Sequence, residues 1–255
     1  GFVDGKSTST VKAITSSKNK TAVENGMAFM LREKTRFGKS GYSENRAFKD
    51  NYLRFQSNNS LKPMLLNKVK NEDRFTDKKL LRMLHNNTGF YIQPKLDGFR
   101  CQGFGDRLQT RDGNVFVIDH IMEEVKQLCE HFNIIDTAFL DGELYNHTMF
   151  LNEISSAVQN QDLEKKLKFH VYDFGIAEIE YSQRLGILTN FFNNMNFQYL
   201  VLHKIDWACN TTEMDMIYQK YLKEGYEGAV IKNPKGFYEF GYRSNNFLKL
   251  KPLET

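Results

Sequence analysis

Lys95 stands where a lysine can act as a nucleophile, between the apolar residues Phe90–Ile92 and the pair Asp97-Gly98. An amine at the end of a buried strand loses part of its hydration, which lowers its pKa and leaves a neutral, nucleophilic fraction. The pattern therefore predicts a covalent reaction at Lys95. The alternative is an ordinary hairpin with an exposed lysine, because Asp-Gly is a common turn signal and lysine is mostly a surface residue.

Four apolar segments, each with one or two polar residues, follow in the chain. They are Phe139–Leu144, Phe169–Phe174, Glu227–Lys232 and Phe247–Lys251. Together with Lys95, this ordered series resembles the covalent nucleotidyltransferase superfamily, which joins a nucleoside monophosphate to the lysine of a Lys-x-Asp-Gly motif. Within that superfamily the chain is similar to the adenylation domain of ATP-dependent DNA ligases of the compact viral and phage type. The resemblance covers roughly Lys62–Pro252.

The resemblance implies that Lys95 forms a covalent bond with AMP taken from ATP. It also implies three contacts with the nucleoside: Glu143 with the ribose hydroxyls, Tyr172 stacked on adenine, and Gln93 facing the exocyclic amine of the base. Many relatives have Glu where this chain has Gln93. Because an amide can both donate and accept hydrogen bonds, the choice of base stays open.

Three lysines and one glutamate correspond to positions that the family uses for phosphates and metal. The resemblance implies α-phosphate contacts for Lys249 and Lys251, a further nucleotide contact for Lys232, and a ligand to Mg²⁺ or Mn²⁺ at Glu227. A strand sends residues two apart to the same face, so the lysines on either side of Leu250 point together. Carboxylate and phosphate oxygens together suit Mg²⁺. A solvent-facing strand on which lysines alternate by chance is the alternative.

Two arginines after the nucleophile occupy positions where the family contacts phosphate. The resemblance places Arg100 near the nucleotide and the reacting strand ends, and Arg111 on the 5′-phosphate of the nick. A guanidinium group binds phosphate through two parallel hydrogen bonds, which suits this role. The alternative is a pair of exposed hairpin arginines of little consequence. Arg184 also fits a family position, with lower specificity.

The implied activity is the sealing of nicked double-stranded DNA in three steps: enzyme–AMP, AMP on the DNA 5′ end, then phosphodiester formation. The run from Tyr238 through Gly241 to Ser244 is similar to one in small DNA ligases and favours this function. An RNA ligase or an mRNA-capping-type nucleotidyltransferase is one alternative, since Lys251-Pro252 is similar to the final motif of capping enzymes. A catalytically silent nucleic-acid-binding module is another.

Composition sets the class of protein. The chain has 255 residues, of which 40% are hydrophobic, enough for a large core. No stretch approaches 18 uncharged apolar residues, so we expect a soluble intracellular protein, a monomer that does not enter membranes. Cys101, Cys129 and Cys209 show no Cys-x-x-Cys spacing, which predicts buried free thiols without a disulfide or zinc site.

Charge divides the chain into a basic front and an acidic back. Residues 1–90 hold 18 Lys and Arg against 8 Asp and Glu, whereas residues 91–255 hold 17 against 23. A basic segment suits a phosphate backbone. We expect residues 1–58 to be either the tail of a nucleic-acid-binding module or a disordered basic arm, and residues 59–255 to be the nucleotidyltransferase domain. The family usually carries an OB-fold domain as well; we expect it to be absent from this chain, and we therefore expect this chain to seal nicks poorly.

The segments between the motifs predict an α+β fold, an ATP-grasp-like nucleotidyltransferase domain with mostly antiparallel sheets and flanking helices. Strands are expected at the motifs and at Phe99–Phe104 and Tyr199–Ile205. Apolar residues at helical spacing predict helices at Met27–Arg36, Asp77–Asn86, residues 117–132, Leu151–Gln159, residues 182–193 and Glu213–Glu224. We expect Ser182 to cap its helix, Gly225 to end the last one, and Leu151–Gln159 to cross the mouth of the site.

Overall fold

The computed structural model describes residues 2–3, 6–7, 61–69, 77–85, 87–134, 138–159 and 166–252. The chain divides into two units, Gly1–Arg54 and Phe55–Thr255. In the first unit, β1 (Phe2–Val3) pairs antiparallel with β2 (Lys6–Ser7). The helix predicted at Met27–Arg36 and the boundary predicted after residue 58 lie outside the described residues, so both stay predictions.

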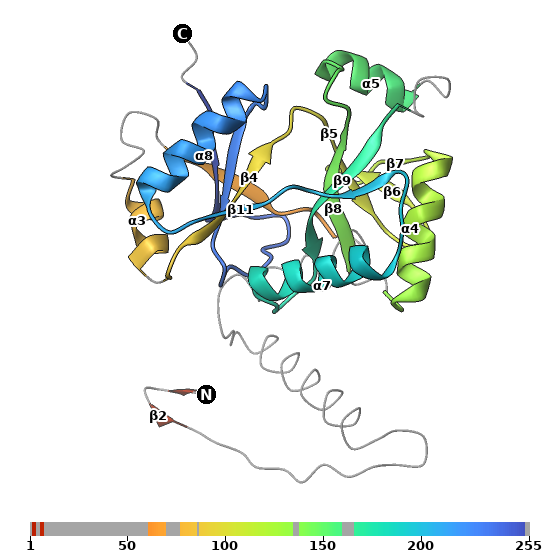
Figure 1. The fold of residues 1–255 in the computed structure, drawn as a ribbon. Coiled ribbons are helices and arrows are strands. Elements are labelled where there is room, and N and C mark those ends of the chain that lie inside the picture. Colours follow the sequence, from red (N-terminus) through yellow and green to blue (C-terminus); the bar gives the residue numbers. More distant parts are fainter. Residues whose placement is uncertain are drawn as a thin grey trace. The chain divides into compact units, whose positions relative to one another are not determined.

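Two sheets form the framework of the second unit (Figure 1). Across the first sheet the strands are β10 (Leu200–Leu202), β9 (Lys168–Gly175), β8 (Phe139–Tyr145), β5 (Phe99–Gly103), β6 (Leu108–Thr110) and β7 (Val115–Phe116). Across the second they are β11 (Asp206–Ala208), β4 (Phe90–Lys95), β12 (Gly228–Lys232), β13 (Arg243–Leu250) and β3 (Leu65–Lys68). Neighbouring strands are antiparallel except in the pairs β10–β9 and β13–β3. The prediction of an α+β fold with mostly antiparallel sheets is therefore confirmed.

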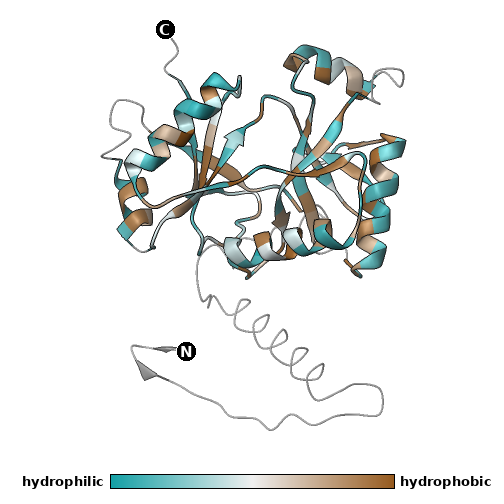
Figure 2. Ribbon diagram, viewed as in Figure 1, coloured by the Kyte–Doolittle hydropathy of each residue, from teal (hydrophilic) through white to brown (hydrophobic). Residues whose placement is uncertain are grey.

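Helices cover both sheets, and their apolar faces turn inward. The helices are α3 (Lys78–His85), α4 (Asp119–His131), α5 (Leu151–Gln159), α7 (Tyr181–Asn194) and α8 (Thr211–Lys223). The five-stranded sheet is contacted by α3 and α8, and the six-stranded sheet by α4, α5 and α7. Figure 2 shows apolar residues concentrated on the strands and on the helix faces turned toward them. No helix in the described part of the chain is both long enough and apolar enough to cross a bilayer.

An aromatic cluster connects the two sheets. Phe139 of β8 packs edge-on against Tyr238, and Phe247 of β13 packs in the same way against Tyr181 at the start of α7. All four side chains are almost fully buried. Aromatic pairs of this geometry contribute about 0.5–1.5 kcal/mol beyond the burial of their area. The cluster thus fixes the sheets relative to each other along the cleft that they share.

The connection from β10 to β11 passes from one sheet to the other. β10 pairs with β9 in the six-stranded sheet, whereas β11, four residues later, pairs with β4 in the five-stranded sheet. The strand predicted at Tyr199–Ile205 is therefore present as β10 but ends at Leu202, three residues earlier than expected. The intervening residues include His203, whose Nε2 donates a hydrogen bond to the carbonyl oxygen of Pro94 at 2.8 Å. This bond fixes the crossing segment to the strand that carries Lys95.

Two expectations about helix ends had different outcomes. Gly225 has φ +87°, a conformation that suits glycine, and it follows Glu224, the C-cap of α8, so the helix ends where Gly225 predicted it. The prediction that Ser182 caps α7 was wrong, because the helix begins one residue earlier and Glu180 is its N-cap. Glu180 and Gln183 form a capping box in which each side chain bonds to the other residue's backbone. Cys101 and Cys129 are buried as expected, but Cys209 is exposed.

Candidate active site

A cavity of about 250 Å³ lies where the two sheets face each other. Eight of the ten residues singled out in the sequence line it: Gln93, Lys95, Arg100, Arg111, Glu143, Tyr172, Lys232 and Lys249. Of the other two, Glu227 forms an ion pair with Lys95, and Lys251 forms an ion pair with the same Glu227. Helix α5 is where the sequence predicted it, but none of its residues lines the cavity, so the expectation that it crosses the mouth was wrong.

Strand register explains how residues of the five-stranded sheet reach the cavity together. Gln93 of β4 is opposite Val230 of β12, which is opposite Lys249 of β13. Paired residues on neighbouring antiparallel strands share a face, so these three side chains form one row across the sheet. The next row on the same face carries Lys232 opposite Phe247. Alternation along each strand then directs the intervening residues into the core behind the sheet.

Lys95 is the last residue of β4, and its Nζ donates to Oε2 of Glu227 and to the carbonyl oxygen of Leu96. The other carboxylate oxygen of Glu227, Oε1, is paired with Nζ of Lys251. Burial works to raise the pKa of Glu227, but the hydrogen bonds from Lys251 and Lys95 outweigh it and lower that pKa. One ionised carboxylate thus holds two ammonium groups, including that of the predicted nucleophile.

Lys232 is a buried cation at the floor of the cavity. Its side chain is only 4% exposed, and its Nζ donates to the carbonyl oxygen of Tyr172 at 2.6 Å. The rings of Tyr181 and Phe247 lie 4.5 and 5.9 Å from the same nitrogen. Burial lowers the pKa of Lys232 to about 8, with partial compensation from Asp173. The ammonium group therefore contacts aromatic rings and one carbonyl oxygen, and the nearest carboxylate oxygen of Asp173 is 3.9 Å away.

Tyr172 reaches the cavity through an irregularity in β9. Asp141 of β8 is opposite Asp173, but the next residue, Gly142, is opposite Val171, so Tyr172 is an extra residue in the ladder. Such bulges re-aim side chains and often occur next to active sites. Here the bulge lets Tyr172 and Asp173, which are adjacent in sequence, both line the cavity.

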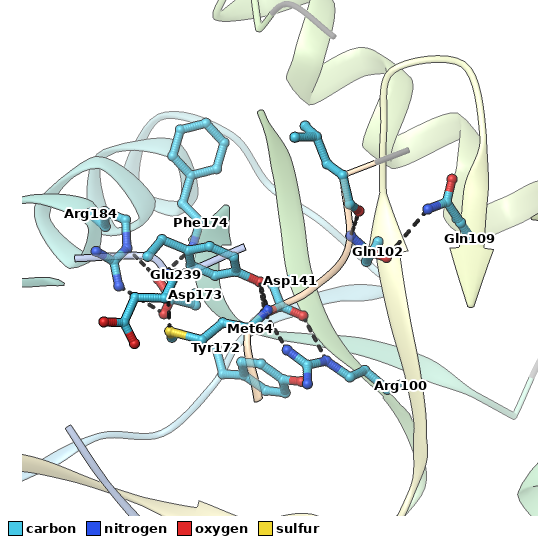
Figure 3. Close-up of polar contacts among 12 residues, drawn as sticks. Met64, Arg100, Gln102, Gln109, Asp141, Tyr172, Asp173, Phe174, Arg184 and Glu239 are labelled. Atoms are coloured by element: carbon cyan, nitrogen blue, oxygen red, sulfur yellow. Dashed lines mark hydrogen bonds and ion pairs between the residues drawn. The ribbon is translucent and has the colours of Figure 1, made fainter. Parts of the chain in front are cut away.

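Arg100 is held by the buried carboxylate of Asp141, which lies on the neighbouring strand β8. The guanidinium of Arg100 makes two hydrogen bonds to Asp141, at 2.7 and 3.1 Å (Figure 3). Tyr238 donates a third to Asp141 at 2.5 Å and accepts one from the backbone N–H of Met64. Burial alone would lower the pKa of Arg100, but Asp141 outweighs it and raises that pKa. Arg100 is thus a fixed cation, with its charge 5.9 Å from the centre of the Tyr172 ring.

Sequence reasoning missed Tyr238 as part of this assembly. Tyr238 had been noted only as the start of a run typical of small DNA ligases, and it is 97 residues from Asp141. Arg184 is a structural residue, since it is fully buried and forms a bidentate ion pair with Asp173. That pair lowers the pKa of Asp173 despite the opposing effect of burial. Arg184 does not line the cavity.

Glu143 lies on β8 directly opposite Arg100 of β5. Burial raises the pKa of Glu143 to about 7, although Arg100 and Lys95 act in the opposite direction. Gly98 approaches this residue so closely that a Cβ at position 98 would lie 2.7 Å from Cγ of Glu143 and 2.6 Å from the carbonyl oxygen of Leu144. Lack of space therefore requires glycine at position 98.

A model of the ATP-dependent DNA ligase domain family matches residues 63–251, which include every residue of this site. The chain belongs to this family. A DNA ligase of African swine fever virus (isolate Warthog/Namibia/Wart80/1980) is 33% identical over 177 residues, covering 64% of this chain and 41% of that protein. The chain thus spans less than half the length of this viral ligase.

Solved structures of the ligase family share the fold. The Chlorella virus DNA ligase-adenylate has a TM-score of 0.57 at 19% identity, over 75% of this chain and 67% of that one. The ATP-dependent DNA ligase of bacteriophage T7, in complex with ATP, has a TM-score of 0.55 at 17% identity, over 74% and 68%. The described residues of the second unit therefore have the fold of the nucleotidyltransferase domain of ATP-dependent DNA ligases.

Proposed function

We propose that this chain is the adenylation domain of an ATP-dependent DNA ligase, and that Lys95 is its nucleophile. The observation that carries the proposal is the setting of Lys95, which ends a central strand, is paired with Glu227, and opens onto a cavity with an aromatic ring and several fixed cations. Membership of the ligase family supports the same reaction.

In the proposed first step, the Lys95 amine attacks the α-phosphorus of ATP. A bond forms between Nζ and phosphorus while the bond from phosphorus to the bridging oxygen breaks. Pyrophosphate departs with that electron pair, and the amine releases a proton to water. Lys249, in the same sheet, and Lys251, on the same carboxylate as Lys95, are the cations closest to the attacked phosphate in this proposal.

The nucleoside would be held by residues from both sheets. Tyr172 offers a ring face for the base, and Glu143 offers hydrogen-bonding oxygens for the ribose. The side-chain amide of Gln93 lines the cavity and has no hydrogen-bond partner within the described part of the chain, which leaves it available to the base. Lys232 contributes positive charge beneath the base and the α-phosphate.

The donor set for a divalent metal is incomplete without substrate. No group of three or more His, Cys, Asp or Glu residues suited to a metal occurs within the described residues. Glu227 has suitable oxygens, but both are paired with lysines. The carboxylate of Glu227 fits Mg²⁺ or Mn²⁺ if one of the two lysines moves away from it. Phosphate oxygens would then supply further ligands, as is usual for Mg²⁺. When bound, the metal would neutralise charge on the departing pyrophosphate.

The later steps would use the two arginines on nicked double-stranded DNA. Arg100, fixed by Asp141, would orient the strand ends near the nucleotide, and Arg111 would bind the 5′-phosphate. AMP would pass from Lys95 to that phosphate, and the 3′-hydroxyl would then displace AMP to seal the nick.

Intact-mass measurement after incubation with ATP and Mg²⁺ tests the first step. We expect the wild-type chain to gain the mass of one AMP, the Lys95→Ala variant to gain none, and the control Lys126→Ala, on the exposed side of α4, to behave as wild type. Labelling that persists without Lys95 would contradict the proposal. Labelling by GTP in place of ATP would favour the capping-type alternative that Gln93 leaves open.

A further inference from the structure

A second cavity, of about 360 Å³, lies beside the first and shares the side chains of Leu96 and His203 with it. Its volume falls within the range of about 300–1,000 Å³ that is typical of small-molecule sites. Nothing in the proposed chemistry of Lys95 uses this cavity.

The lining of the second cavity is basic. Lys166, Lys168 and Lys204 line it, and no Asp or Glu in the described part of the chain does. Lys204 is paired with Glu224, at 3.0 Å. Lys166 and Lys168 are exposed, and within the described residues neither has a carboxylate at ion-pairing distance. These are the two ammonium groups that we expect to meet an anion in the second cavity.

Aromatic and imidazole rings form the other part of the lining. The ring of His147 lies 5.0 Å from that of Tyr226 and 5.9 Å from that of Tyr145, which in turn lies 5.5 Å from His170. Burial lowers the pKa of His170 to about 4 and that of His203 to about 3, so both imidazoles are neutral at pH 7. Neutral rings offer flat faces, and the lysines supply the charge.

Rings and lysines in one cavity match the chemistry of a nucleotide, whose base stacks on rings and whose phosphate pairs with ammonium groups. A metal does not explain the three histidines, because no group of three or more ligand-type side chains converges in the described part of the chain. We propose that the second cavity binds one nucleotide, either free or as a unit of a nucleic-acid strand. The proposal does not depend on Lys95 being a nucleophile.

A ligand in the second cavity would change the surroundings of Lys95. His203 lines both cavities and donates a hydrogen bond to the carbonyl of Pro94, the residue before Lys95. Tyr226, another lining residue, directly precedes Glu227, the partner of Lys95. The second cavity is thus a neighbouring subsite with direct covalent and hydrogen-bonded connections to the first.

Calorimetric titration with AMP tests the free-nucleotide source. The titrations use the full chain with Lys95→Ala, which prevents covalent labelling. We expect two AMP sites in this background, one of which is abolished or weakened at least tenfold when Lys166→Glu and Lys168→Glu are added. The matched control, Lys78→Glu with Lys126→Glu, changes the net charge equally on exposed residues of α3 and α4 that line neither cavity. It should keep both sites.

Binding of a fluorescent oligothymidylate tests the strand source. We expect the Lys166/Lys168 double variant to bind at least tenfold more weakly than the control double variant. The slope of log affinity against log salt should also fall by about one for each lysine removed. His147→Ala, which removes an exposed ring without changing the lysines, should weaken binding about fivefold or more because the base can no longer stack on that ring.

The results distinguish a failure of the nucleotide proposal for the second cavity from a failure of the proposed reaction at Lys95. If neither probe responds to the Lys166/Lys168 changes more than to the control changes, the second cavity is not a nucleotide site, whatever happens at Lys95. If oligothymidylate binding responds to the lysines but not to His147→Ala, simple surface charge explains it and the proposal also fails. If only one AMP site is found and it disappears when Lys166 and Lys168 are replaced, the result supports nucleotide binding in the second cavity. The same result argues against AMP binding in the first cavity.

Discussion

Glu143 is held in surroundings that favour its protonated form. Because burial raises its pKa from 4.5 to about 7, the native state binds this proton more tightly than the unfolded chain does. The contribution of this proton to the free energy of unfolding is fully present below pH 4.5 and is lost as the pH rises through about 7. Glutamine does not titrate, so Glu143→Gln should not lose stability in this way. We therefore expect the free energy of unfolding of the variant, minus that of wild type, to rise by up to about 3 kcal/mol between pH 5 and pH 8.

Denaturant titrations of both proteins at several pH values measure this difference. The comparison cancels the titration of all other groups, which the two proteins share. A difference that stays constant from pH 5 to pH 8 would show that Glu143 is ionised throughout that range in the native state.

Tyr238 and Tyr181 are two buried tyrosines whose hydroxyl groups differ in their partners. The Tyr238 hydroxyl bonds to Asp141 and to the Met64 backbone, whereas the Tyr181 hydroxyl is buried and has no hydrogen-bond partner within the described residues. We expect Tyr238→Phe to lower the free energy of unfolding by about 1–3 kcal/mol, because it leaves buried groups unpaired. Tyr181→Phe should be neutral or stabilising. Equal effects of the two changes, measured by thermal or denaturant unfolding, would contradict this interpretation of the Asp141 assembly.

The ten residues singled out in the sequence lie in or beside one site because each is on a strand or directly next to a strand end, and the two sheets bring these strands together. What the sequence could not provide was the partner of each charge. The contact between Tyr238 and Asp141 depends on the packing of a loop against another sheet, and no local pattern encodes it. The extra residue that turns Tyr172 into the cavity has the same origin, since alternation along a strand gives no sign of a bulge.

At the scale of elements, helix α7 offers a test of local capping. Glu180 and Gln183 form a capping box, whereas Ser182, the residue that sequence preference favoured, lies inside the first turn. We expect Glu180→Ala to lower the free energy of unfolding by about 0.5–2 kcal/mol, the usual cost of losing an N-cap. Ser182→Ala should change it by less than about 0.5 kcal/mol. Chemical denaturation distinguishes the two, and the reverse order of effects would restore Ser182 as the cap.

Helices were predicted better than strands, for a physical reason. The apolar stripes of α4 and α8 are local patterns, so their predicted and observed limits differ by one to two residues. β11 is only Asp206–Ala208, and it is a strand because β4 provides its partner. A three-residue strand has too little pattern of its own to be recognised, so the crossing from β10 to β11 could not be foreseen.

At the scale of the whole molecule, the chain combines a basic first unit with a second unit that holds the proposed site. Residues 1–54 carry 11 Lys and Arg against 5 Asp and Glu, and all ten proposed site residues lie within residues 63–251. We expect deletion of residues 1–54 to leave AMP adduct formation within about twofold of wild type, since the groups that surround Lys95 are retained. Affinity for nicked duplex DNA should fall, and its dependence on salt should weaken by about 0.9 in slope for each DNA phosphate that the shortened chain no longer neutralises.

A variant that keeps residues 1–54 shows whether the deletion acts through the lost positive charge or through the lost segment itself. Replacing Lys12, Lys18, Lys20 and Lys39 with Gln removes four positive charges while keeping the segment. If the first unit contributes mainly by charge, this variant should reproduce most of the change in salt dependence while forming the AMP adduct normally. If deletion of residues 1–54 instead abolishes the adduct while the Gln variant forms it, the first unit is part of the catalytic machinery, and the proposed division of labour between the two units is wrong.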